Sequence, residues 1–149
     1  MLFRSYYHFT SKNDIVKSIV DARVEEITEL LAWVRGQKPS PDLLERAVLR
    51  WVDSTAVDKL RGIRFSNANP AVIRDSGANR PGIKEGLAAV AELLAGKDAD
   101  PERLLLVRMA LSSINAAVMA AMGNQFTDEE IVAAAREMAL ALIRRLREP

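Results

Sequence analysis

The sequence predicts an all-α fold of five or six helices, and three observations support this prediction. Apolar residues recur at intervals of three and four through most of the chain, which is the spacing of one helix face. Capping residues precede several of these stretches, and glycine or proline follows them. No segment alternates apolar and polar residues as a half-buried strand does. At 149 residues, 49% hydrophobic and 28% charged, the chain is long enough to bury one core.

The first and longest predicted helix begins near Lys12 and ends at Gly36. Ser11 and Asp14 form a variant of the capping box at its start. Residues spaced by 4, 4, 3, 4 and 3 form one helical stripe, which consists of Val16, Val20, Val24, Ile27, Leu31 and Val34.

The middle of the chain combines clear helices with a less regular segment. A second helix is predicted over residues 42–62, after a breaker that contains two prolines. Asparagine, proline and glycine, which favour turns, recur through residues 61–82, where only residues 70–74 indicate a short helix. Helical spacing resumes at Ile83 and stops at Gly96.

The last two predicted helices cover residues 101–122 and about 128–147. Asp100 caps the first of them, with a proline at the first helical position. Thr127 and Glu130 form a capping box for the second.

Composition and charge exclude several classes of function. The 21 Lys and Arg residues against 20 Asp and Glu give a formal net charge of +1, so the whole chain carries no basic field for nucleic acid or a membrane. The chain has no cysteine and one histidine, His8, which excludes thiolate sites and most histidine-based catalytic and zinc sites. Glu25, Glu26 and Glu29 lack the Glu-x-x-His spacing of a carboxylate metal bundle. No apolar run approaches a membrane span. We therefore expect a cytoplasmic protein that is not an enzyme and has no cofactor or metal.

The segment over residues 5–16 resembles a signature of the TetR-type transcriptional regulators. In that family, the end of the recognition helix and the start of the next helix carry the pattern Tyr-Tyr-His-Phe-Pro-Ser-Lys-x-x-Leu. The positions of this chain that match the pattern are Tyr6, Tyr7, His8, Phe9, Ser11 and Lys12. Thr10 replaces the usual proline, Ser5 and Phe3 also depart from the family, and Ile15 takes the apolar position.

The resemblance implies that Tyr6, His8 and Lys12 contact the DNA backbone. The chemistry agrees, because hydroxyl, imidazole and ammonium groups donate to phosphate oxygens. Alternatively, Lys12 is an ordinary solvated charge. The resemblance also divides the chain into a remnant of the helix-turn-helix head, residues 1–11, and a ligand-binding and dimerisation domain, residues 12–149. The chain as given would then lack most of the helix-turn-helix.

The last two predicted helices favour a homodimer. The helix over residues 101–122 is apolar around nearly its whole circumference, as a helix buried on all sides is. Two such helices from each of two copies would form an intersubunit four-helix bundle. The candidate interface residues are Leu111, Ile114, Ala117, Val118, Ala121, Ala135, Met138 and Leu142. The alternative is a helical hairpin that covers the chain's own core.

A ligand pocket is predicted between the middle helices and the penultimate one. Pockets combine apolar walls with a few polar groups, and the candidate residues are Trp51, Arg64, Phe65, Asn67, Asn69, Ile73, Met109 and Met119. Alternatively, the aromatic residues and methionines belong to the core and the asparagines to turns.

These observations together predict a ligand-responsive, repressor-like transcriptional regulator. It would act as a homodimer on operator DNA under the control of an unknown small-molecule effector. The alternative function is a helical dimeric ligand-binding or interaction module that does not bind DNA.

Overall fold

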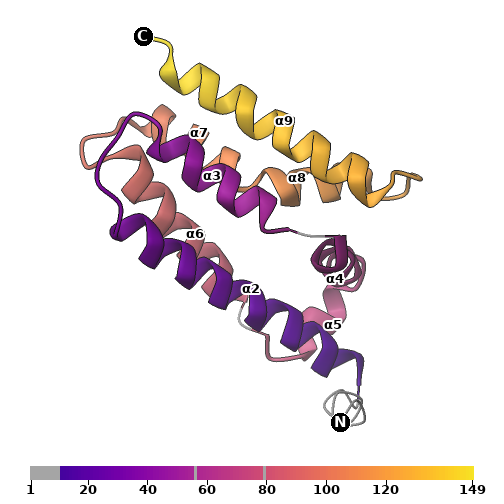
Figure 1. Ribbon diagram of the computed structural model, residues 1–149. Coiled ribbons are helices and arrows are strands. Elements are labelled where there is room, and N and C mark those ends of the chain that lie inside the picture. Colours follow the sequence, from indigo (N-terminus) through magenta and orange to yellow (C-terminus); the bar gives the residue numbers. More distant parts are fainter. Residues whose placement is uncertain (1–10, 56, 79) are drawn as a thin grey trace, which may run out of the picture.

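The computed structural model describes residues 11–55, 57–78 and 80–149 of the chain. This part of the chain is all-helical, and Figure 1 labels its eight helices α2 to α9. Their bounds are α2 (Lys12–Arg35), α3 (Leu43–Asp53), α4 (Val57–Ala68), α5 (Pro70–Asp75), α6 (Arg80–Ala95), α7 (Pro101–Leu111), α8 (Ser113–Ala121) and α9 (Asp128–Arg147). The sequence predicts five or six helices. The number is higher in the structure because two of the predicted helices are each broken in two.

The long helix α2 starts and ends where the sequence predicts. The Ser11 hydroxyl oxygen accepts a hydrogen bond from the Asp14 amide at 3.3 Å, and Gly36 caps the other end. The side chains that α2 buries are Val16, Val20, Arg23, Ile27, Leu30 and Val34. The buried stripe thus contains a charged residue, Arg23, where the sequence pattern assigns Val24.

The segment predicted as one helix over residues 42–62 is broken between α3 and α4. The Ser54 hydroxyl donates to the Trp51 carbonyl oxygen at 2.6 Å. The buried Thr55 hydroxyl accepts a hydrogen bond from the Arg23 guanidinium at 3.3 Å. Hydroxyl groups that bond in this way compete with helix continuation. The two helices consequently point in different directions (Figure 1).

The helix predicted over residues 101–122 is also broken, at Ser112. The helices α7 and α8 meet there at a bend of 60°. The indole nitrogen of Trp51 on α3 donates to the Leu111 carbonyl oxygen at 2.9 Å. A side chain from a neighbouring helix therefore binds the backbone at the bend, which is a known cause of helix kinks.

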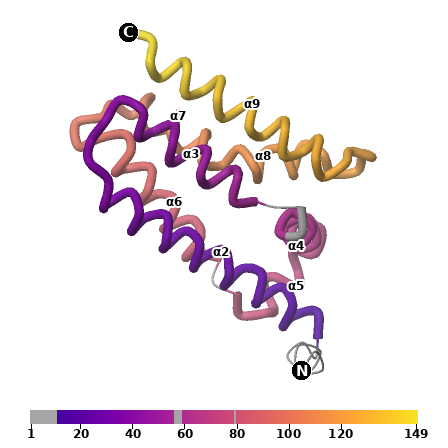
Figure 2. The backbone as a smooth tube through the Cα atoms, viewed as in Figure 1, coloured from indigo at the N-terminus to yellow at the C-terminus, as the bar shows by residue number. Residues whose placement is uncertain are grey.

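The helices pack around one main core and one small cluster. Figures 1 and 2 show α2 running beside α6, with α3 lying between α2 and α9. Helix α9 packs against α7 and α8. The small cluster joins Val16 and Val20 of α2 to Ile73 of α5. The short helices α4 and α5 thus cover the N-terminal half of α2.

We expect Thr127→Ala to lower the free energy of unfolding by about 1 kcal/mol. Thr127 and Glu130 form the capping box that the sequence predicts. The Thr127 hydroxyl oxygen accepts from the Glu130 amide at 3.1 Å, and the Glu130 carboxylate accepts from the Thr127 amide at 2.8 Å. Urea unfolding followed by circular dichroism measures the loss. Thr28→Ala is the matched control, because Thr28 is exposed within α2 and caps no helix. Equal losses in the two variants would contradict the prediction.

Candidate functional site

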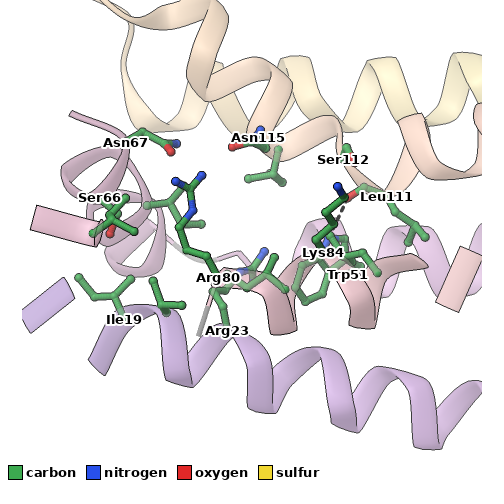
Figure 3. A pocket seen from close by; sticks show the side chains of 16 residues that line it. Ile19, Arg23, Trp51, Ser66, Asn67, Arg80, Lys84, Leu111, Ser112 and Asn115 are labelled. Atoms are coloured by element: carbon green, nitrogen blue, oxygen red, sulfur yellow. Dashed lines mark hydrogen bonds between the residues drawn. The ribbon is translucent and has the colours of Figure 1, made fainter. Parts of the chain in front are cut away.

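A cavity of about 320 Å³ lies beside the bend between α7 and α8 (Figure 3). Its volume falls at the lower end of the range of ligand pockets, about 300–1,000 Å³. Each helix from α2 to α8 contributes at least one residue to its wall. The lining residues are Ile19, Val20, Arg23, Trp51, Ile63, Ser66, Asn67, Ile73, Arg80, Ile83, Lys84, Leu87, Leu111, Ser112, Ile114 and Asn115.

Arg23 is a buried cation on this wall, and its neighbours compensate its charge. Its Nη1 donates to Glu26 Oε2 at 2.6 Å, and its guanidinium lies 3.8 Å from the centre of the Trp51 ring. Burial lowers the pKa of Arg23, and the hydrogen bond to Glu26 opposes that shift. Lys59 Nζ also lies 2.7 Å from the Glu26 carboxylate. Arg23 therefore positions Trp51 and ties α2 to its neighbours.

Arg80 and Lys84 are different, since neither side chain has a hydrogen-bond or ion-pair partner within the described ranges. Both side chains are exposed and lie four residues apart on α6, so they share one face of that helix. Among the residues that the structure describes, no Asp or Glu lines the cavity. The α6 side of the cavity therefore carries an excess of positive charge.

Asn67 on α4 adds an unused hydrogen-bond donor to the wall. Its Nδ2 atom is buried and has no hydrogen-bond partner among the described residues. A buried donor left in this state costs about 1–3 kcal/mol. In Figure 3 the Arg80 side chain extends toward the side of the cavity where Asn67 and Asn115 lie. Because Nδ2 has almost no accessible surface, the Asn67 side chain must rotate before it donates to an acceptor in the cavity.

Of the eight residues predicted to line a pocket, three lie on the wall of this cavity. They are Trp51, Asn67 and Ile73. Met109 and Met119 do not line it, and these residues are 39% and 53% exposed.

The other three predicted pocket residues also lie off the cavity wall and have partners elsewhere. Arg64 Nη1 donates to Asp128 Oδ1 at 2.6 Å, which joins α4 to the start of α9. Phe65 packs against the small cluster formed by α2 and α5. Asn69 Nδ2 donates to the Phe65 carbonyl oxygen at 2.8 Å. Their contacts are those of structural residues.

The sequence prediction missed the contributions of α2 and α6 to the cavity. A signal for α2 was present, because Arg23 occupies a core position of the α2 stripe. A signal for α6 was the spacing of Arg80, Lys84 and Leu87, which puts two cations and an apolar residue on one helix face.

The residues predicted to contact the DNA backbone are only partly described. Tyr6 and His8 lie outside the described residues. Lys12 is exposed and is the first residue of α2.

The predicted dimer residues are mostly buried within a single chain. Five of them expose at most 5% of their surface, namely Leu111, Ile114, Val118, Ala121 and Ala135. Ala117, Met138 and Leu142 are half-buried. Because α8 and α9 pack against each other, the apolar spacing of these residues reflects the chain's own core. This burial fits the alternative interpretation of a helical hairpin.

The described residues offer few other sites. No group of three or more metal-ligating side chains occurs among residues 11–55, 57–78 and 80–149. In the same ranges no single helix is long and apolar enough to cross a membrane, although the bent pair α7 and α8 meets those criteria when taken together. No protein-family model, curated protein or solved structure matches the chain.

Proposed function

We propose that the chain is the ligand-sensing and dimerising part of a TetR-type transcriptional regulator. The cavity beside the α7–α8 bend is the observation that carries this proposal. A mostly apolar cavity with a few polar groups suits a small molecule. The resemblance of residues 5–16 to the family's junction segment supports the regulator class.

Helix α2 connects ligand binding to the proposed DNA-binding head. Ile19, Val20 and Arg23 line the cavity, and the same helix begins at Lys12, within the junction segment. A ligand that binds one pose of α2 more tightly shifts the population toward that pose. A tilt of α2 in both copies of a dimer changes the spacing of two DNA-binding heads, and operator half-sites are sensitive to that spacing.

The second copy is proposed to pack on an exposed apolar face of α7 and α8. Leu105 and Met109 lie one turn apart on α7 and are 58% and 39% exposed, and Met119 on α8 is 53% exposed. Exposed apolar side chains that lie together are typical of interaction surfaces, where methionine is enriched, and we place these three residues on one such face. This α7–α8 face, defined by Leu105, Met109 and Met119, replaces the buried residues that the sequence pattern assigns to the interface.

A charge on the α7–α8 face is expected to separate the dimer. Met109→Glu would bury a carboxylate between two copies, so self-association should weaken by about tenfold or more. Sedimentation velocity at micromolar concentration measures this for the unmodified chain and the variant. Ile15→Glu is the matched control, because Ile15 is a 38% exposed residue of α2. A monomeric unmodified chain would contradict the dimer, and equal weakening by both variants would contradict the choice of face.

A thermal-shift screen of small molecules tests the sensing role. A ligand that binds only the folded chain should raise the melting temperature in a saturable manner.

Two further observations test the relation to DNA. In a gel-shift assay the purified chain should not bind DNA sequence-selectively, because base readout needs a helix in the major groove. The genomic DNA upstream of the Met1 codon should encode a helix-turn-helix in frame. Ligand binding without such a head would favour the alternative module, whereas a chain that no small molecule stabilises would contradict the sensing role.

A further inference from the structure

We infer that the cavity selects amphipathic anions, meaning small molecules with an apolar body and one carboxylate, and that Arg80 and Lys84 bind the carboxylate. This inference rests on the proposed ligand-binding role and names the chemical class of the ligand.

The charge of the cavity favours an anion. Arg23 already has Glu26 as its partner. In the part of the chain that the structure describes, the side chains of Arg80 and Lys84 have no partner, and no acidic residue lines the cavity. A neutral or cationic ligand would remove water from Arg80 and Lys84 and provide no negative charge in return, so the desolvation of these cations would oppose its binding. A carboxylate would instead form charge-assisted hydrogen bonds with both groups.

The hydrogen-bonding groups agree with the charge. The buried Nδ2 of Asn67 is a donor without a partner in the described ranges, and a carboxylate is an acceptor with several lone pairs. Figure 3 places Asn67, Asn115 and the end of Arg80 on the same side of the cavity in that view. Binding of an acceptor there, with a rotation of the Asn67 side chain, would give this donor a partner and remove its desolvation cost.

The apolar residues of the cavity wall favour a ligand whose remaining part is apolar. Side chains such as Val20, Trp51, Ile73 and Leu111 present hydrocarbon or aromatic surface to the cavity. Burial of apolar area there supplies binding energy in proportion to the area. A volume of about 320 Å³ limits the ligand to a small body. The site therefore fits a short-chain or small aromatic acid better than a fully polar anion such as phosphate.

Isothermal titration calorimetry on the unmodified chain tests the inference with matched head groups. One series is octanoate, octanamide and octylamine, and a second is naphthoate, naphthamide and naphthylmethylamine. In each series that binds, the carboxylate should bind about tenfold more tightly than the amide, as expected for hydrogen bonds to a charged group. An amide or amine that binds as tightly as its carboxylate overturns this inference and leaves the proposed sensing role intact. If no member of either series binds, this result contradicts the proposal that the cavity is a ligand site.

A double variant tests the assignment of the two residues. Arg80→Gln with Lys84→Gln should weaken carboxylate binding by about tenfold and leave amide binding within about twofold. Both side chains are exposed, so the folded state should remain stable, and urea unfolding verifies this. Arg74→Gln with Lys97→Gln is the matched control, because it removes the same charge from exposed positions off the cavity wall. Equal weakening by both pairs would show a long-range charge effect and overturn the assignment.

Discussion

Trp51→Ala is expected to lower the free energy of unfolding by about 4 kcal/mol, within the range for removal of a buried tryptophan. The Trp51 side chain is only 4% exposed and lies in the main core. Its ring faces the buried Arg23 guanidinium at 3.8 Å, and its indole nitrogen donates to the Leu111 carbonyl oxygen at 2.9 Å. The substitution therefore leaves a cavity and also removes one partner from a buried cation and from the backbone at the α7–α8 bend.

Two further variants separate these contributions. Trp51→Phe keeps most of the ring but removes the hydrogen bond to Leu111, so it should cost about 1–2 kcal/mol. Trp33→Ala is the matched control, because Trp33 is half-buried at the edge of the same core, stacks with two exposed arginines and makes no hydrogen bond to Leu111. Urea unfolding followed by far-ultraviolet circular dichroism measures all three variants without relying on tryptophan fluorescence. A loss for Trp33→Ala as large as that for Trp51→Ala would contradict the prediction.

Several helix starts could be predicted from the sequence because caps are local, whereas α4 continues to Ala68 rather than ending near Gly62, and α6 begins at Arg80 rather than Ile83. Ser11, Asp100 and Thr127 each accept a hydrogen bond from an amide three residues ahead, and such a contact needs no distant residue. The breaks inside two predicted helices depend on contacts between helices. Arg23 binds Thr55 across 32 positions, and Trp51 binds the Leu111 carbonyl oxygen across 60. The helical periodicity of the sequence does not indicate such contacts.

The cavity could be predicted only in part for a similar reason. Trp51, Asn67 and Ile73 were identified by residue type, as apolar or polar groups in the middle of the chain. The sequence alone assigns no role to Arg80 and Lys84, because exposed cations on a helix are typical of a solvated face. Their position beside the cavity depends on how α6 packs against α2, and that packing is a property of the tertiary structure.

Gly86→Val is expected to lower the free energy of unfolding by about 3 kcal/mol, at the upper end of the usual cost of overpacking. Gly86 lies on α6 where that helix packs along α2. A Cβ atom at Gly86 would lie within 2.4 Å of Ile27 Cγ2, closer than unstrained atoms approach. Ile27 is 1% exposed, and a β-branched side chain in a helix has one strongly preferred χ1 rotamer. The clash therefore has to be relieved by separating the two helices.

A double-mutant cycle with Ile27→Ala tests this explanation. Removal of Cγ2 from residue 27 makes room for the new side chain, so the double variant should be more stable than the sum of the single losses predicts, by about 1 kcal/mol or more. Glu85→Val is the control for the effect of valine on the helix itself. Glu85 is exposed on the same helix, and its substitution should change the free energy of unfolding by about 0.5 kcal/mol at most. Additive losses in the cycle would show that Gly86→Val acts through contacts other than the one with Ile27.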